Sequence, residues 1–201
     1  MAIPRIRAAV LALHWQVNVI RPEGFFGPML AAPVATSGVV ARAVEFHRAA
    51  AARDVPVLFT RFTIPVGEGQ LVRNTGFMRS VGAAQTEFRP NSPGSQLIPE
   101  MAAQASEVFD NQKLSGVAGN ELAGWCTDQG IDTLFITGVA TNLTVEQTAR
   151  QATDLGFTVH PVADCVTAAS AQAHEAALAT LELVTAGSLT AAQALELVAR
   201  R

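Results

Sequence analysis

Three segments of the chain place reactive side chains or free backbone groups directly after apolar runs. His14 follows the first apolar run, Asn111 and Lys113 follow a later one, and a turn of small residues spans 138–144. Histidine titrates near neutral pH and can exchange a proton with water or a substrate. An amide or a hydroxyl can orient a substrate, and the free N–H groups at the start of a helix can hold an anion or oxyanion. These residue types predict proton-transfer or hydrolytic chemistry on a small molecule.

The elements that would position these groups alternate between short apolar runs and alanine-rich amphipathic stretches, which is typical of βαβ units and a mainly parallel sheet. We expect strands at 8–13, 55–62, 107–109, 133–137 and 158–162. We expect helices near 35–53, 121–129, 142–155, 170–185 and 190–200, with a sixth strand ending at 187–189. Residues 1–201 are expected to form a single domain. Ligands of such sheets bind beyond the carboxyl ends of the strands, where the strand order reverses. The turn 138–144 lies at such an end, although an ordinary strand-to-helix turn with capping residues has the same pattern.

Residues 63–96 do not follow this alternation. They are rich in glycine and proline and contain Arg73, Arg79 and Arg89. Loops of this length in a compact domain are usually functional or disordered. The segment is either a lid whose arginines meet an anionic substrate or a surface excursion with solvated charges, and for any single arginine we favour the second interpretation.

The net charge of −3 argues against a nucleic-acid or anionic membrane surface as the main partner and favours a small molecule. The two cysteines, Cys126 and Cys165, are too few and too far apart for a disulfide framework or a zinc motif, which favours a reducing cytoplasm. Both are expected to be small buried apolar groups. We expect no signal peptide and no membrane span.

The segment Ile-Thr-Gly-Val-Ala-Thr-Asn-Leu-Thr-Val-Glu-Gln-Thr-Ala-Arg at 136–150 resembles the signature of the isochorismatase-like, or cysteine hydrolase, superfamily. The resemblance covers nearly the whole chain, with further landmarks at 11–16, 55–61, 92–97 and 163–165. It implies an α/β fold with a Rossmann-like parallel sheet of about six strands and helices on both faces.

The same resemblance implies a catalytic aspartate, lysine and cysteine, and these three positions fall on His14, Asn111 and Thr144. Lys113, the sole lysine of the chain, lies two residues beyond the lysine position and could substitute for it. We favour Asn111 in the pocket and an exposed Lys113. All three catalytic identities therefore differ from the family pattern.

The replacements suggest a changed chemistry. His14 could act as a general base or acid that activates water. Thr144 could be a nucleophile activated by His14 or a hydroxyl that orients water or substrate, and Asn111 could hydrogen-bond a carbonyl or hydroxyl. The backbone N–H groups of Ala140 and Thr144 would stabilise negative charge. A lone histidine can equally be a hydrogen-bonded structural residue.

We therefore predict an enzyme that acts without a cysteine on a small, cyclic or carboxylated metabolite, by hydrolysis or proton-transfer elimination. The alternatives are a catalytically inactive protein that binds a small molecule, and an amidase with a threonine nucleophile.

Aromatic residues could form an apolar wall for a ring-bearing substrate. The candidates are Trp15, Phe25, Phe26, Phe62 and Phe77. As core packing they would need no function.

No metal or cofactor is expected, because the Asp-x-His arrangement of metal-dependent nicotinamidase relatives is absent at 61–65. The resemblance also implies a homodimer or larger homo-oligomer, with residues 63–96 as a candidate contact between subunits.

Overall fold

Five parallel strands form one sheet in the computed structural model, which describes residues 7–199. The strands are β1 (Ala8–Leu13), β2 (Val57–Phe62), β3 (Glu107–Asn111), β4 (Thr133–Val139) and β5 (Thr158–Thr167), in the spatial order β3-β2-β1-β4-β5. From β1 the chain builds the sheet outward through β2 and β3, and then returns to place β4 on the other side of β1. The strand order therefore reverses between β1 and β4, where a parallel sheet opens a crevice at its carboxyl end.

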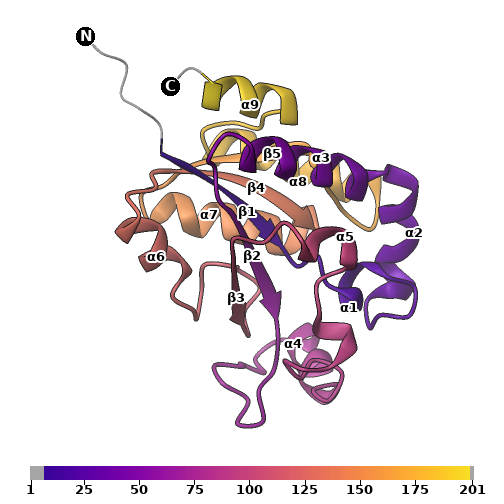
Figure 1. Ribbon diagram of the computed structural model, residues 1–201. Coiled ribbons are helices and arrows are strands. Elements are labelled where there is room, and N and C mark those ends of the chain that lie inside the picture. Colours follow the sequence, from indigo (N-terminus) through magenta and orange to yellow (C-terminus); the bar gives the residue numbers. More distant parts are fainter. Residues whose placement is uncertain (1–6, 200–201) are drawn as a thin grey trace.

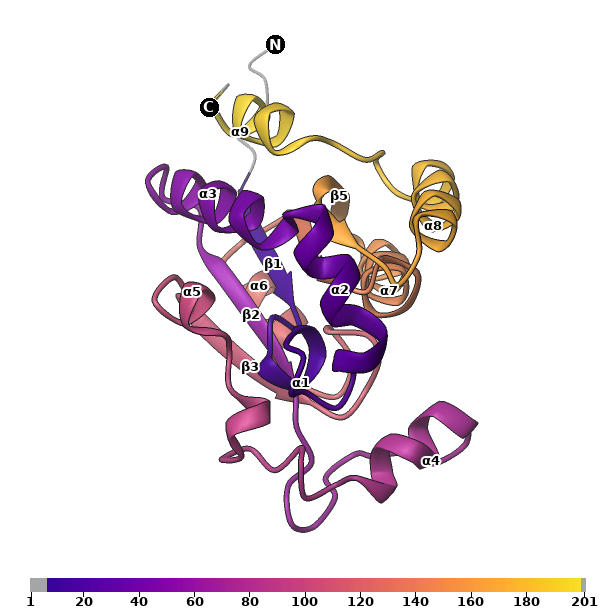
Figure 2. The same ribbon diagram turned by 90° about the vertical axis from the view of Figure 1, so that its right-hand side faces the viewer.

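Helices cover both faces of the sheet (Figures 1 and 2). They are α1 (Val17–Ile20), α2 (Gly27–Ser37), α3 (Val39–Ala51), α4 (Gly76–Ala83), α5 (Pro99–Ala102), α6 (Leu122–Asp128), α7 (Glu146–Asp154), α8 (Ala171–Val184) and α9 (Ala191–Ala199). Two short turns are helical as well: η1 (Pro93–Ser95) is a 3₁₀ turn and η2 (Thr141–Val145) is a π-helical turn that leads into α7. The α/β architecture with a parallel sheet is therefore as the sequence predicts.

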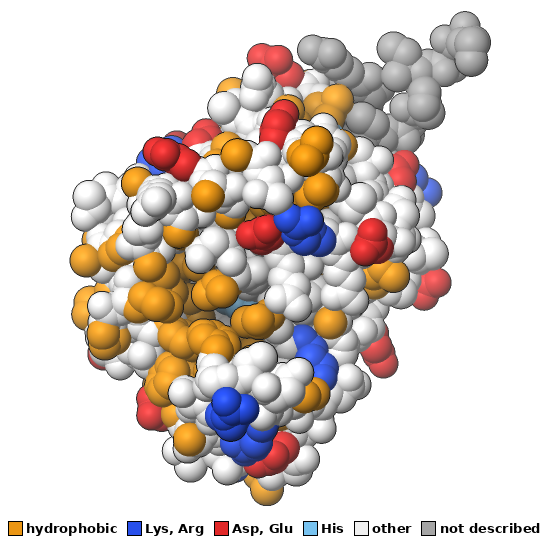
Figure 3. Space-filling model, turned by 180° about the vertical axis from the view of Figure 1, so that it is seen from behind, with side chains coloured by type: hydrophobic (Ala, Val, Ile, Leu, Met, Phe, Trp, Pro, Cys, Tyr) orange, Lys and Arg blue, Asp and Glu red, His pale blue; other side chains and the backbone are white. Residues whose placement is uncertain are grey.

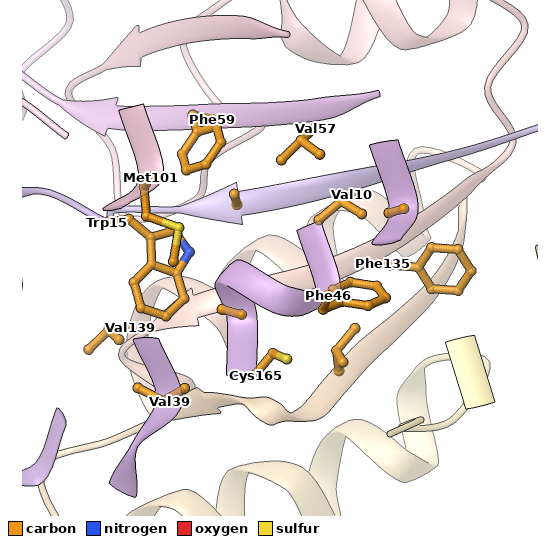
Figure 4. Close-up of a cluster of buried hydrophobic side chains, with 14 of the residues drawn as sticks. Val10, Trp15, Val39, Phe46, Val57, Phe59, Met101, Phe135, Val139 and Cys165 are labelled. Atoms are coloured by element: carbon orange, nitrogen blue, oxygen red, sulfur yellow. The ribbon is translucent and has the colours of Figure 1, made fainter. Parts of the chain in front are cut away.

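The sheet has a separate core on each face because successive side chains of a strand point to opposite sides. One core packs β1, β2 and β4 against α2, α3 and α9, and Figure 4 shows part of it. The other packs alternate residues of the same strands against α6, α7 and α8. β1 is buried along its whole length, as expected for the central strand of a covered parallel sheet.

Two expected elements differ in the structure. The sixth strand is reduced to one bridge, in which Leu189 accepts a hydrogen bond from Ala163 (2.8 Å) and donates one to Pro161 (2.9 Å) before the chain enters α9. The expected helix 35–53 is two helices, because Gly38 adopts a left-handed conformation (φ 65°) that ends α2 and begins α3. The helix also starts earlier, at Gly27, than its sequence pattern suggested.

The segment 63–96 is an excursion from the sheet, as expected, but it is not structureless. It contains α4, whose N-terminus is capped by the Thr75 hydroxyl accepting from the N–H of Met78 (3.1 Å). Its apolar side chains form a third, smaller core with the end of β2. Figure 2 shows α4 projecting from the main body beyond the carboxyl ends of β1 and β2.

Within residues 7–199 no single helix is long and apolar enough to cross a membrane. α2 and α3 together meet the criterion of length and composition, but they are bent by 67° at their junction.

Candidate active site

An apolar pocket lies at the carboxyl ends of β1 and β4, where the strand order reverses. It encloses a cavity of about 40 Å³. Its lining residues come from the ends of strands, from α1, α2 and α4, and from the turn η2: His14, Val19, Phe26, Met29, Leu30, Phe62, Phe77, Val81, Leu114, Val139, Ala140, Leu143 and Thr144. Figure 3 shows hydrophobic side chains gathered around a hollow on the side of the molecule where α2 and α4 lie. His14 and Thr144 are the polar side chains of this lining.

His14 is the first residue after β1, and its backbone adopts a left-handed conformation (φ 54°). This conformation is unfavourable for a non-glycine residue and is concentrated at functional sites. The side chain is only 6% exposed, and Nε2 has no hydrogen-bond partner among the described residues. Burial lowers the pKa of the His14 imidazole from 6.5 to about 4, because the cation would lose its hydration. His14 is therefore neutral at pH 7, with an unpaired ring nitrogen.

The turn η2 places Ala140 and Thr144 beside His14 in the pocket lining. The carbonyl oxygen of Ala140 accepts from the N–H groups of Leu143 and Val145 (both 3.2 Å), which gives the turn its wide, π-helical shape. β4 approaches β1 closely at Gly138 (φ 137°), where a Cβ would collide with the carbonyl oxygen of Leu13. Glycine at this position therefore lets the start of the turn lie against the end of β1.

The hydroxyl of Thr144 already has a hydrogen-bond partner within the protein. It donates to the carbonyl oxygen of Leu114 at 2.7 Å, and the residue is 2% exposed. A carbonyl oxygen is not a base that could accept the proton permanently, and no hydrogen bond joins Thr144 to His14 in the described part of the chain. The geometry thus lacks the nucleophile-to-base hydrogen bond that marks an activated hydroxyl.

Asn111 and Lys113 do not line the pocket. Asn111 is buried at the end of β3, where its Nδ2 donates to the carbonyl oxygens of Ser115 (2.6 Å) and Ala118 (3.1 Å). Its Oδ1 is buried without a partner. Lys113 is half-buried and packs near Gly119. Asn111 therefore holds together the loop that carries Leu114, and its contact with the pocket is indirect.

The aromatic candidates divide between the pocket and the cores. Phe26, Phe62 and Phe77 line the pocket, with the rings of Phe26 and Phe77 stacked at 5.5 Å. Phe25 lies behind them, edge-on to Phe26 at 4.9 Å, and does not line the pocket. Trp15 is fully buried in the core that also holds Met101 and Val139, and it does not line the pocket (Figure 4).

Gln16 is a positioning residue that the sequence analysis noted only as part of a motif. Its Nε2 donates to the carbonyl oxygens of Phe62 (3.1 Å) and Ser95 (2.9 Å), and its Oε1 accepts from the N–H of Phe62 (2.7 Å). The side chain is fully buried. It therefore ties the end of β1 to the end of β2 and to η1.

The sequence analysis also missed most of the apolar lining. The missed residues are Val19, Met29, Leu30, Val81, Leu114, Val139 and Leu143. Aliphatic side chains in helices and strand ends have no feature in the sequence that distinguishes a pocket wall from core packing.

The arginines of the excursion have other partners and do not line the pocket. Arg73 pairs with Glu68 at 2.5 Å, and Arg79 reaches the carbonyl oxygen of Arg73 at 3.5 Å. Arg89 donates to backbone carbonyl oxygens of residues 64 and 65. The role of these arginines as partners of an anionic substrate is not supported by this geometry.

Both cysteines are free, fully buried and outside the pocket. Burial raises the pKa of the Cys126 thiol to about 11, and burial together with the nearby charge of Asp164 raises that of Cys165 to about 12. Among residues 7–199 there is no group of three or more His, Cys, Asp or Glu that could hold a metal ion.

The parallel sheet and the pocket at its topological switch point define an α/β protein whose pocket lies where proteins of this class commonly bind ligands. The model of the isochorismatase domain matches residues 8–193, and the chain belongs to this family. It is 33% identical over 85 residues to the isochorismatase family protein YwoC of Bacillus subtilis (strain 168), a match that covers 42% of this chain and 45% of YwoC. The curated relatives are thus matched over less than half of their length.

Solved structures agree with the fold. The chain resembles a cysteine hydrolase from Pseudomonas syringae pv. phaseolicola 1448A with a TM-score of 0.84, 21% identity and coverage of 100% and 96% of the two chains. It resembles the pyrazinamidase of Pyrococcus horikoshii, solved in complex with zinc, with a TM-score of 0.71, 21% identity and coverage of 92% and 99%. At these identities the likeness shows the shared fold.

Proposed function

We propose that this protein is an isochorismatase-family enzyme that works without a cysteine, with His14 as the proton-transferring group acting on a small molecule. The observation that supports this most directly is the unpaired Nε2 of His14 at the pocket. A buried polar atom without a partner costs free energy, and at His14, unlike at the core atom Nδ1 of His47, that atom belongs to a residue of the pocket lining. A backbone in a left-handed conformation at the same residue adds to that cost.

In a hydrolytic reaction the neutral imidazole would accept a proton from water while the water oxygen attacks the electrophilic carbon of the substrate. The resulting imidazolium would then return that proton to the leaving group, so that the histidine ends neutral. The burial that lowers the pKa of His14 also weakens it as a base in the empty pocket. Negative charge that develops on the substrate beside it would stabilise the imidazolium and raise its pKa during the reaction.

The other candidate residues receive supporting roles. Thr144, whose hydroxyl proton is directed at Leu114, would use its remaining lone pair to orient water or substrate. The N–H groups at the start of the helix formed by η2 and α7 would favour developing negative charge near Ala140. Asn111 would act as a positioning residue for the loop that carries Leu114.

A protein that binds a small molecule without turnover is the second candidate. The almost wholly apolar lining favours it, because such a lining provides few groups that could stabilise a charged transition state.

The test is mass-spectrometric profiling of a metabolite extract incubated with wild-type protein, with His14→Ala and with His14→Gln. Loss of a compound in the wild-type sample, slowed by about 10² or more in both variants, is the expected result. Circular dichroism spectra of the variants control for folding. Turnover at an equal rate in the variants would disprove the role of His14, and a ligand recovered unchanged from every sample would favour the binding protein.

A further inference from the structure

We infer that this pocket takes an uncharged, apolar ligand group and rejects carboxylates. The inference rests on the proposed function only in that both take this pocket as the substrate site. It replaces the carboxylated metabolite that the sequence analysis included among the substrates. The contacts and charges around the pocket, rather than the family, support it.

The first argument is the absence of a counter-charge. Among residues 7–199, none of those that line the pocket is Arg, Lys, Asp or Glu. A carboxylate removed from water without a cation or several hydrogen-bond donors loses its hydration without compensation, which costs several kcal/mol or more.

The second argument concerns the cationic side chains that the chain could have used. Arg73, Arg79 and Arg89 lie in the segment next to the pocket, and each is engaged with a carboxylate or with carbonyl oxygens elsewhere. Arg61 forms a two-point pair with Asp110 (2.8 and 3.0 Å) at the ends of β2 and β3. Lys113 is outside the lining. Within residues 7–199, a carboxylate in the pocket would therefore meet a cation only if one of these arginines left its partners or Lys113 moved in from outside the lining.

The third argument is the state of His14, the titratable group of the lining. The groups packed around it, from α1, α2, α4, β2 and η2, are apolar side chains and the Thr144 hydroxyl. No carboxylate is present there to hold the imidazole in its charged form, and its burial favours the neutral form. As the acceptor that the proposed mechanism requires, the unpaired Nε2 of neutral His14 can take a hydrogen bond from a neutral donor such as the N–H of an amide, whereas a carboxylate has no proton to give it.

The fourth argument is size. A cavity of about 40 Å³ is much smaller than the roughly 150 Å³ engineered cavity that holds benzene. The buried part of the ligand is therefore a compact group, and the rest must lie toward the mouth, where Met29 is 42% exposed. A ring can enter fully only if side chains of the lining move apart.

Matched pairs of probes test the charge preference directly: isobutyramide against isobutyrate, and benzamide against benzoate. Dissociation constants are measured by ligand-observed NMR titration at about pH 7.5, with the full chain. We expect each amide to bind at least about tenfold more tightly than its carboxylate.

Two variants at the mouth make the test specific. Met29→Arg introduces a cation at an exposed position of the pocket lining, and should raise the affinity of each carboxylate relative to its matched amide by about tenfold, whatever the change in packing does to both. Met29→Gln is the matched uncharged control and should leave the preference as in the wild type. Tighter binding of the carboxylates in both variants would mean that the substitutions act through packing rather than charge, and would count against the inference.

Equal or tighter binding of the carboxylates by the wild-type protein would overturn the inference, and so would the failure of all four probes to bind. The inference and the proposed function can fail separately. A preference for amides without consumption of any metabolite would support this inference and refute the proposal that the protein is an enzyme. Consumption of an anionic metabolite that depends on His14 would support the enzyme and refute this inference.

Discussion

The buried histidines should make the stability of this protein fall steeply in mildly acidic solution. His47 lies in the core among the rings of Trp15, Phe46 and Phe59, with no exposed surface. Its Nε2 shares a hydrogen bond with the Thr137 hydroxyl at 2.9 Å, and its Nδ1 has no partner. Burial lowers the pKa of His47 from 6.5 to about 3.

The sign follows from the two pKa values. Above pH 6.5 His47 is neutral in both states, so protonation does not affect stability. Below that pH His47 is protonated in the unfolded chain but stays neutral in the folded protein until about pH 3. The free energy of unfolding therefore falls by about 1.4 kcal/mol per pH unit. Between about pH 7 and about pH 5 this amounts to roughly 2 kcal/mol. His14, with its pKa lowered to about 4, should contribute a similar loss over the same interval.

Urea denaturation of the wild type and His47→Gln, at about pH 7 and about pH 5, measures how much of the acid-induced loss of stability is due to His47. The variant should lose roughly 2 kcal/mol less than the wild type on acidification, because one of the histidines that the unfolded chain protonates more readily than the folded protein is gone. Phe46→Leu is a matched control: it perturbs the same core without removing a titratable group, so its penalty should be equal at both pH values. An acid-induced loss that is the same in His47→Gln as in the wild type would refute this reasoning.

Three further predictions concern the site and its surroundings. Gln16→Leu should destabilise the protein by roughly 3 kcal/mol or more in urea denaturation, because it removes the side-chain partners of one N–H and two carbonyl oxygens. A loss well below that value would contradict the role of Gln16 in tying the ends of β1 and β2 together. Replacing both Cys126 and Cys165 by alanine should preserve turnover or ligand binding, and the native protein should resist iodoacetamide at about pH 8, as judged by intact mass. Thr144→Val should cost about 1 kcal/mol of stability by loss of the bond to Leu114, with Thr144→Ser retaining it. An acyl adduct on Thr144 in mass spectra taken during turnover would contradict its assignment as an orienting group.

The sequence by itself determined the fold class and indicated the strand ends where the structure has a pocket. The sequence predicted all five strands. A strand buried on both faces must be continuously apolar, a requirement visible within six residues at 8–13, whereas the edge strand β3 is largely exposed and carries only a short apolar run. The small-residue turn after β4 and the motif at 11–16 follow two of the strand ends that border the pocket.

Only the tertiary structure decided what each side chain at those ends does. Trp15 and His14 are neighbours in sequence, yet one packs in the core and the other lines the pocket, because the left-handed backbone at His14 redirects the chain. Asn111 donates hydrogen bonds to carbonyl oxygens of its own loop and does not line the pocket. The apolar wall depends on segments such as α2 and α4 that meet only in the folded chain. Periodicity and residue type are local properties that a sequence displays, whereas burial, hydrogen-bond partners and the pKa of His14 depend on residues distant in the chain.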